Sequence, residues 1–156
     1  MEKNYDDIIW TIMHFDDLSV NQLFDLLELR TRIFVLEQNC PYQEVDVKDK
    51  IAFHSFAYNK SGKMIAVARI LPPGISYDEV SFGRVGIDLE SRGKGLAHLL
   101  TRNLIAFISS RYPTKSIRIS AQCYLIEFYE KHNFIKVSKE YDEDGIPHIE
   151  MLKSSN

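Results

Sequence analysis

A glycine-rich basic turn, Arg92-Gly93-Lys94-Gly95, is the part of the sequence best suited to hold an anion. It follows a short apolar run at residues 85–87 and precedes an apolar stretch that indicates a helix beginning at about Gly95. The first backbone N–H groups of a helix have no partner within it, and the aligned peptide dipoles place partial positive charge there. Glycine lets an anion approach the backbone closely. The turn therefore predicts a phosphate or pyrophosphate site, the alternative being a solvated turn that only joins a strand to a helix.

Two familiar phosphate-binding motifs are excluded by inspection. The P-loop requires Ser or Thr after its Gly-Lys pair, whereas Gly95 follows Lys94. The dinucleotide fingerprint G-x-G-x-x-G requires a third glycine or alanine, and His98 stands at that position. The predicted anion site is therefore of another kind.

Length and composition exclude several classes of protein. A chain of 156 residues with 45% hydrophobic residues predicts a single domain, residues 1–156, with a sizeable core. The net charge of −3 argues against a nucleic-acid partner, so the basic turn and Arg102 form a local positive spot suited to a small anionic ligand. No apolar run predicts a membrane span, and residues 1–7 lack a signal-peptide pattern. Two cysteines form no disulfide framework, so a cytoplasmic location is expected.

The remaining chain must position this turn. β-rich runs predict strands at residues 8–13, 52–58, 63–71, 80–87, 116–121, 135–141 and 147–152. Helical periodicity predicts helices over about residues 20–37, 95–111 and 125–132, and a capping box of Ser19 and Gln22 opens the first. Three successive strands indicate antiparallel pairing, whereas the strand–helix–strand around residue 100 requires a parallel crossover. The expected fold class is α/β (α+β), a mixed, mostly antiparallel central sheet flanked by helices.

This order of elements, with two motifs placed on it, resembles the GNAT superfamily of N-acetyltransferases. Arg92-Gly93-Lys94-Gly95-Leu96-Ala97 matches the Arg/Gln-x-x-Gly-x-Gly/Ala motif for acetyl-CoA. Tyr129-Glu130-Lys131-His132-Asn133-Phe134 matches a helix end of the form Tyr-x-x-x-Gly/Asn-Phe, and asparagine tolerates the left-handed conformation of such an end. The stretches at residues 34–42, 83–85, 121–122 and 144–149 resemble the ElaA-like subfamily. The resemblance implies a GNAT-like acyl-CoA N-acyltransferase fold.

The resemblance also implies acetyl-CoA as cosubstrate, with no metal. The pyrophosphate would lie on the N–H groups of the glycine-rich turn. The pantetheine arm would bond to the preceding strand like an added strand, because two parallel strands that splay apart leave backbone groups unpaired. The residues implied in cofactor binding are Val85, Gly86, Ile87, Arg92, Gly93, Lys94, Gly95, Leu96, Ala97 and Gln122.

The implied chemistry is direct attack of an amine on the thioester carbonyl. A backbone N–H near Val85 to Ile87 would stabilise the oxyanion, and such donors are commonly worth about 3 kcal/mol each. Tyr129 takes the family's place as proton donor to the leaving thiolate. A phenol has a pKa of about 10 and a thiol about 8.5, so this transfer is feasible. The alternative is a helix tyrosine packed in the core.

A protonated amine must lose a proton to a base before it attacks, and no motif in the sequence identifies which residue is that base. Glu44 and His148 are the leading candidates, and Asp46 and Glu79 share the chemistry. His54 lies in an apolar strand and is expected to be a core histidine. A base acting through water, or no base, stays open.

Two further residues and two segments each have a structural and a functional interpretation. Cys123 suggests an acetyl-cysteine intermediate, but a small structural cysteine is the commoner case. Arg84 is expected to be a salt-bridge partner rather than an acceptor contact. The acidic segments at residues 37–50 and 140–144 could attract a cationic amine, although charge runs are more often solvated surface.

Two classes of function follow from the sequence. The first is an acetyl-CoA-dependent N-acetyltransferase that modifies an amine of a small molecule or peptide. The second is a non-catalytic CoA-binding sensor or interaction module. Among enzymes, an acyltransferase that uses longer acyl chains is the rival. The sequence leaves open whether the chain forms a homodimer.

Overall fold

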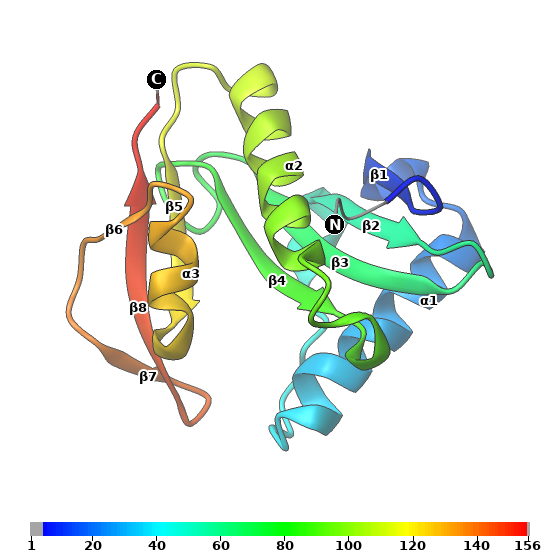
Figure 1. Ribbon diagram of the computed structural model, residues 1–156. Coiled ribbons are helices and arrows are strands. Elements are labelled where there is room, and N and C mark those ends of the chain that lie inside the picture. The colour runs from blue at the N-terminus through cyan, green and yellow to red at the C-terminus, as the bar shows by residue number, and fades with distance from the viewer. Residues whose placement is uncertain (1–4, 156) are drawn as a thin grey trace.

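The computed structural model describes residues 5–155 and contains two four-stranded sheets (Figure 1). The first sheet has the order β1 (Ile9–His14), β2 (Phe53–Tyr58), β3 (Met64–Leu71) and β4 (Ser81–Ile87), with every pair antiparallel. The second has the order β5 (Ile117–Gln122), β8 (Ile146–Lys153) and β6 (Ile135–Lys136), and β7 (Tyr141–Glu143) also pairs with β8. The mixed α/β fold class is confirmed.

Three helices accompany the sheets: α1 (Val20–Arg30), α2 (Leu96–Arg111) and α3 (Ile126–Glu130). The predicted capping box is present, because Ser19 Oγ accepts from the Gln22 N–H (3.1 Å) and Gln22 Oε1 accepts from the Ser19 N–H (2.9 Å). The predicted helix over residues 20–37 is confirmed in extent, but its last part, Thr31–Glu37, is a π-helix. Short 3-10 segments lie at Phe15–Asp17, Val47–Ile51, Leu89–Ser91 and Cys123–Leu125.

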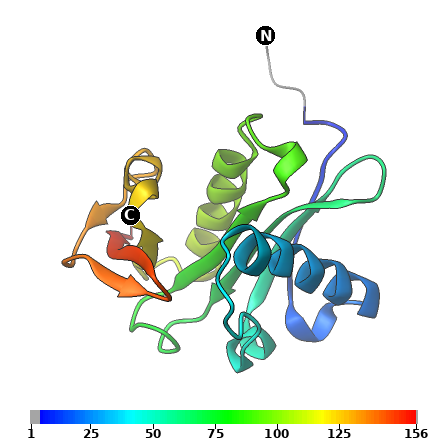
Figure 2. The same ribbon diagram turned by 90° about the horizontal axis from the view of Figure 1, so that it is seen from below.

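The helices cover the two faces of the first sheet (Figure 2). On one face, the apolar stripe of α2 (Leu96, Leu100, Leu104 and Ile108) joins a core that continues into β5, β8 and α3. On the other face, Leu26, Leu29, Ile33 and Phe34 pack against Phe56, Met64 and Val67. Burial of these apolar side chains is the main driving force that holds the three layers together.

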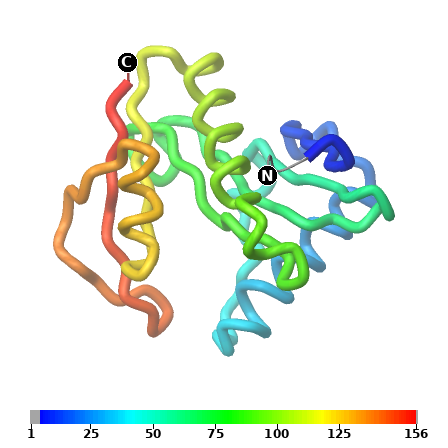
Figure 3. The backbone as a smooth tube through the Cα atoms, in the orientation of Figure 1, coloured from blue at the N-terminus to red at the C-terminus, as the bar shows by residue number. Residues whose placement is uncertain are grey.

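The two sheets meet at one point. Val80 and Ile117 form the one parallel bridge found between β4 and β5, supported by hydrogen bonds from Val80 N–H to Ser116 carbonyl (3.2 Å) and Arg118 N–H to Val80 carbonyl (2.9 Å). Figure 3 shows the chain leaving β4, passing through α2 and returning in β5, which then diverges from β4. The expected parallel pair is thus confined to this bridge, and the expected single sheet is two sheets.

Aromatic rings connect the two halves of the fold. Phe82 from β4 lies 6.2 Å from Tyr129 of α3 and 5.9 Å from Phe134, measured between ring centroids. These three rings belong to the core that β4 shares with α3 and β8.

The predicted strand at residues 135–141 is wrong in one respect, because it is two short strands, β6 and β7. Ser138 Oγ accepts from the Glu150 N–H (2.9 Å), so a side chain takes the place of a backbone partner. The ladder with β8 is interrupted there. Among residues 5–155, no helix is long and apolar enough to cross a membrane.

Candidate active site

The turn before α2 presents a run of backbone amides with no partner. No hydrogen bond from the N–H groups of residues 93–97 is found in the described part of the chain, and the N–H of Leu99 is the first to bond back, to the Gly95 carbonyl (3.2 Å). The helix they open is sixteen residues long, and its dipole adds partial positive charge. Such a cradle of donors can hold a diphosphate.

Left-handed glycines shape this turn. Gly93 and Gly95 have φ values of 77° and 82°, which disfavour any side chain, and Gly95 is the N-cap of α2. A Cβ on Gly93 would meet nothing within 4 Å, so this backbone faces open space. Two contacts of Arg92 hold the turn in place. Its Nε donates to the Ile87 carbonyl (2.9 Å), and its guanidinium pairs with Glu37 (2.6 Å). Arg92 is therefore committed within the chain.

A β-bulge interrupts β4 where the strands have separated. Val67 pairs with Gly86 and Arg69 with Gly83, so Arg84 and Val85 together face a single residue of β3. Arg84 has a left-handed φ of 53°, an unusual conformation for a non-glycine residue. A bulge takes backbone groups out of the ladder and redirects them. It can therefore present N–H donors to a ligand between the sheets.

Gly86 has a packing role in the same strand. A Cβ at this position would lie 2.9 Å from Cδ1 of Ile33 and 3.2 Å from Cζ of Phe34. The π-helical segment that carries these two side chains can approach β4 only because Gly86 has none. The sequence placed Gly86 beside the cofactor, and the structure supplies this second reason for a glycine.

Tyr129 lies in the core between the two sheets and is 5% exposed. Its ring packs against Phe82 and, edge-on, against Phe134 and Phe128. Burial is the main cause that raises the pKa of Tyr129 far above 10, with the nearby Tyr124 phenol contributing. The phenol is therefore neutral at physiological pH and is a weaker acid than an exposed tyrosine.

Two predicted site residues are neighbours across the second sheet. Gln122 of β5 pairs with His148 of β8, and the Gln122 amide donates to Gln38 Oε1 at 3.5 Å, a long contact between the sheet and the N-terminal half. His148 Nδ1 lies 2.7 Å from the Ile146 carbonyl, and Nε2 lies 3.1 Å from the Glu143 carboxylate. Both ring nitrogens of His148 thus lie within hydrogen-bonding distance of an oxygen acceptor.

Glu44 is buried on the α1 side of the first sheet, with 4% of the residue exposed. Its Oε1 accepts from Arg30 Nε and from Arg84 Nε, both at 2.7 Å. The salt-bridge role predicted for Arg84 is confirmed. Glu44 Oε2 is enclosed and makes no hydrogen bond within residues 5–155. No hydrogen bond, ion pair or ring contact in that range joins Tyr129 to Glu44 or His148.

The buried cluster of ion pairs around Glu44 extends to Asp49. Arg30 pairs with Asp49 at 2.7 Å, and Arg69 bridges Asp46 (2.7 Å) and Asp49 (3.0 Å). Burial by itself would raise the pKa of Asp49, but the hydrogen bond from Arg30 and the charges of Arg30 and Arg69 lower it to about 2. With Glu37 held by Arg92, all four carboxylates of the acidic segment at residues 37–50 are paired with arginines. This compensation weakens the expectation that the segment attracts a cation.

Two other predictions concerned single residues. His54 is 1% exposed and its Nε2 lies 2.9 Å from the Asp49 carbonyl, so its place in the core is confirmed. Burial and the nearby Glu140 raise the pKa of the Cys123 thiol. A raised thiol pKa lowers the thiolate fraction and disfavours a covalent acetyl-cysteine route.

Sequence reasoning missed Gln38 and Glu143, the contacts of Gln122 and His148. A signal for Glu143 was present, because Asp-Gly at residues 144–145 is typical of a two-residue hairpin turn. Both turn residues have positive φ, and Glu143 pairs with Ile146. No local signal identifies Gln38, which reaches Gln122 across 84 residues of sequence.

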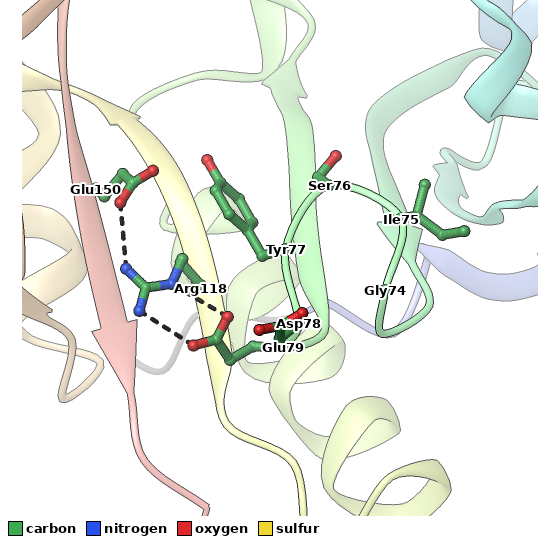
Figure 4. Close-up of a pocket in the computed structure, with 8 residues that line it drawn as sticks. All are labelled: Gly74, Ile75, Ser76, Tyr77, Asp78, Glu79, Arg118 and Glu150. Carbon is green, nitrogen blue, oxygen red and sulfur yellow. Dashed lines mark hydrogen bonds and ion pairs between the residues drawn. The ribbon is translucent and has the colours of Figure 1, made fainter.

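A hollow of about 440 Å³ lies beside the bridge between the sheets (Figure 4). Arg118 crosses it, held by Glu79 through two contacts of 3.1 Å and by Glu150 at 3.2 Å. Its lining residues are Gly74, Ile75, Ser76, Tyr77, Asp78, Glu79, Arg118 and Glu150. The charges of Arg118, Glu79 and Glu150 are paired with one another, so one arginine connects two sides of this polar hollow. It is separate from the amide cradle.

An open amide turn, a bulged strand and two strands that diverge beyond a single parallel bridge occur together in this chain. The family model for the acetyltransferase (GNAT) domain matches residues 30–155. The chain belongs to this family.

Individual relatives and solved structures agree with this family assignment. The protein ElaA of Escherichia coli is 37% identical over 147 residues, which cover 94% of this chain and 96% of ElaA. The crystal structure of ElaA superimposes with a TM-score of 0.88, covering 94% of this chain and 99% of that one. A crystal structure of an acyl-CoA N-acyltransferase from Pseudomonas aeruginosa gives a TM-score of 0.90 at 37% identity, with the same two coverages. The chain is thus similar to ElaA over nearly its whole length.

Proposed function

We propose that this protein is an N-acetyltransferase that moves the acetyl group of acetyl-CoA to an amine of a small molecule or peptide. The observation that carries the proposal is the run of amides at residues 93–97, which have no hydrogen-bond partner among residues 5–155. They lie in front of a strand that pairs with no described residue on its β5 side beyond Val80. The five amides suit a diphosphate. The exposed edge of β4 suits the amide groups of a pantetheine arm.

The residues divide by role. Backbone groups of Val85, Gly86 and Ile87 would align the arm, and Gln122 would contact it from the opposite strand. The Ile87 carbonyl oxygen already accepts a hydrogen bond from Arg92, so this oxygen has one lone pair left for the arm. The bulge at Arg84 and Val85 supplies the donors for the oxyanion, where one good hydrogen bond lowers the barrier by about 3 kcal/mol.

Tyr129 acts as the acid that protonates the departing thiolate. Its buried phenol is neutral, and general acid catalysis by a positioned side chain typically contributes about 10²–10⁴-fold. Because no hydrogen bond anchors the hydroxyl in the described chain, its removal should leave folding intact. The nitrogen–carbonyl bond forms, the carbon–sulfur bond breaks, and the phenolic proton goes to sulfur.

The His148–Glu143 pair is the proton acceptor that the geometry supports better. Glu143 is half exposed, and its carboxylate contacts His148 Nε2. It can therefore accept a proton from the ammonium group of an incoming acceptor while it stays in contact with the imidazole. Glu44 is the other candidate, but its free oxygen is enclosed. We assign Glu44 to holding Arg84, and hence the bulge, in position.

Thiol release from acetyl-CoA across a panel of primary amines, peptides and polyamines tests the proposal. Tyr129→Phe should lower kcat by about 10²-fold or more without changing thermal stability. Tyr124→Phe is the matched control, because Tyr124 is 75% exposed, and it should keep full turnover. Normal turnover in Tyr129→Phe removes this residue from the mechanism.

Binding is measured separately. CoA should stabilise the protein thermally, and Gly95→Glu should abolish that effect by placing a side chain and a negative charge at a left-handed position of the cradle. Stabilisation by CoA with no thiol release for any acceptor favours a non-catalytic CoA sensor. Stronger stabilisation by octanoyl-CoA than by acetyl-CoA favours a longer acyl donor.

A further inference from the structure

The π-helical segment Thr31–Glu37 contacts both ends of the loop that connects β4 to the amide turn. Arg32 Nη1 donates to Oδ1 of Asp88, the first residue of that loop, at 2.6 Å. At the other end of the loop, Arg92 Nη2 donates to Glu37 Oε2, also at 2.6 Å. Two ion pairs of opposite polarity thus join the segment to the first and the last residue of the loop.

The π-helical geometry explains how one short segment reaches both ends of the loop. Arg32 and Glu37 are five residues apart. In an α-helix, residues at this spacing point about 140° away from each other, because 3.6 residues complete a turn. A π-helix forms its hydrogen bonds between residues i and i+5 and therefore brings residues five apart toward one side. The two side chains can then face the same loop.

An apolar contact lies between the two ion pairs. Gly86, two residues before Asp88, is the position where a Cβ would lie 2.9 Å from Ile33 Cδ1 and 3.2 Å from Phe34 Cζ. Both of these side chains belong to the π-helical segment and are buried. The segment therefore contacts the chain at the end of β4 and at both ends of the loop that follows.

Further bonds make the loop a compact unit. Asp88 is 2% exposed, and its Oδ2 lies 3.1 Å from Lys63 Nζ. Its N–H donates to the Ile65 carbonyl, and its carbonyl accepts from the Ser91 N–H, both at 2.9 Å. The last residue of the loop, Arg92, directly precedes the amides of residues 93–97. The position of the loop therefore determines where those amides lie.

We propose that the π-helical segment positions the amide turn for the coenzyme, with Arg32 and Glu37 as positioning residues. They act through Asp88 and Arg92 and need no contact with the coenzyme themselves. The inference rests on the proposed function and deepens it, because it names residues outside the glycine-rich motif that determine coenzyme affinity. Hydrogen bonds weaken steeply as their angles depart from linear, so a displaced turn donates less well to a diphosphate.

Charge by itself predicts the opposite effect on affinity. Glu37 and Asp88 are carboxylates next to the predicted anion site, and their negative charge opposes the binding of a diphosphate. Removing either charge would therefore tighten the binding of CoA if the charge alone mattered. If the two carboxylates act by holding the loop, removing either one weakens the binding. The sign of the change distinguishes the two explanations.

Calorimetric titration with CoA measures this sign. The dissociation constant should rise about fivefold in Glu37→Ala, which removes a partly exposed ion pair, and about tenfold in Asp88→Asn, whose carboxylate is buried. The stoichiometry should stay unchanged. Glu37→Gln lacks the charge but keeps an acceptor for Arg92, so it should recover part of the affinity that Glu37→Ala loses. Glu90→Ala is the matched control, because this loop carboxylate is 85% exposed and pairs with Lys63 at 3.5 Å, and it should not weaken binding.

The other outcomes overturn the inference. Unchanged or tighter CoA binding in Glu37→Ala and Asp88→Asn rules out positioning and leaves the proposed function standing. A lower stoichiometry with an unchanged dissociation constant shows that the variants lose folded protein, and it also rules out positioning. If the unmodified protein binds no CoA, the proposed function fails and the inference fails with it.

Discussion

Replacing Arg30 by methionine tests how strongly the buried ion pairs stabilise the α1 side of the site. Arg30 is 1% exposed and contacts Glu44 and Asp49, both at 2.7 Å. Methionine keeps much of the apolar stem and removes the charge, which leaves two buried carboxylates with one arginine fewer. Breaking a buried pair from one side costs about 3–5 kcal/mol. We expect about 3 kcal/mol, because Arg84 and Arg69 still hold the two carboxylates.

The pKa of Asp49 gives part of this energy independently. Burial opposes its ionisation, but Arg30 and Arg69 hold the folded-state pKa at about 2, against an ordinary value of 3.8. The difference corresponds to about 2 kcal/mol of stability at neutral pH. Because the folded-state pKa is the lower one, this stability is fully present above about pH 5 and is lost as the pH falls through 4 toward 2. At pH 3, about 1 kcal/mol of it should be gone.

Urea unfolding at pH 6.5 and at pH 3 measures both effects. Arg30→Met should cost about 3 kcal/mol at pH 6.5, and its difference from the unmodified protein should narrow by about 1 kcal/mol at pH 3. Arg111→Met is the control, because it removes an exposed guanidinium that lies over the Phe53 ring, and it should cost less than about 1 kcal/mol at either pH. A loss below about 1 kcal/mol for Arg30→Met at pH 6.5, or a difference that stays constant in acid, would refute the reasoning.

Two further substitutions probe packing and capping. Gly86→Ala should lower the free energy of unfolding by about 1–3 kcal/mol, because its Cβ would lie 2.9 Å from Ile33 Cδ1. Adding Ile33→Val removes that atom and should restore part of the loss, whereas Gly83→Ala, whose Cβ meets nothing within 4 Å, should show no such clash in the same urea assay. Ser19→Ala removes the N-cap acceptor of α1 and should cost about 1 kcal/mol, measured as a lower Tm, and an unchanged Tm would contradict the capping geometry.

Much of the fold follows from local signals in the sequence. The capping box at Ser19 and the glycines before α2 each act within a few residues. Their effect depends on backbone geometry that neighbours in sequence determine. For the same reason the glycine-rich turn and the start of α2 were predicted in place, whereas anion binding by residues 93–97 stays a prediction. The interruption of residues 135–141 was not predicted, because it depends on a hydrogen bond between Ser138 and Glu150 across the sheet.

The functional surroundings of that cradle depend on the tertiary structure. The sequence could propose Glu44 and His148 as bases, but only the fold enclosed Glu44 between Arg30 and Arg84 and set His148 against Glu143. It also brought His98 and His132 within 2.9 Å of each other across 34 residues of sequence. Spacing along the chain determines helices, strands and turns, because those form between near neighbours. Which charges are paired is decided by packing between distant segments, and no periodicity in the sequence indicates it.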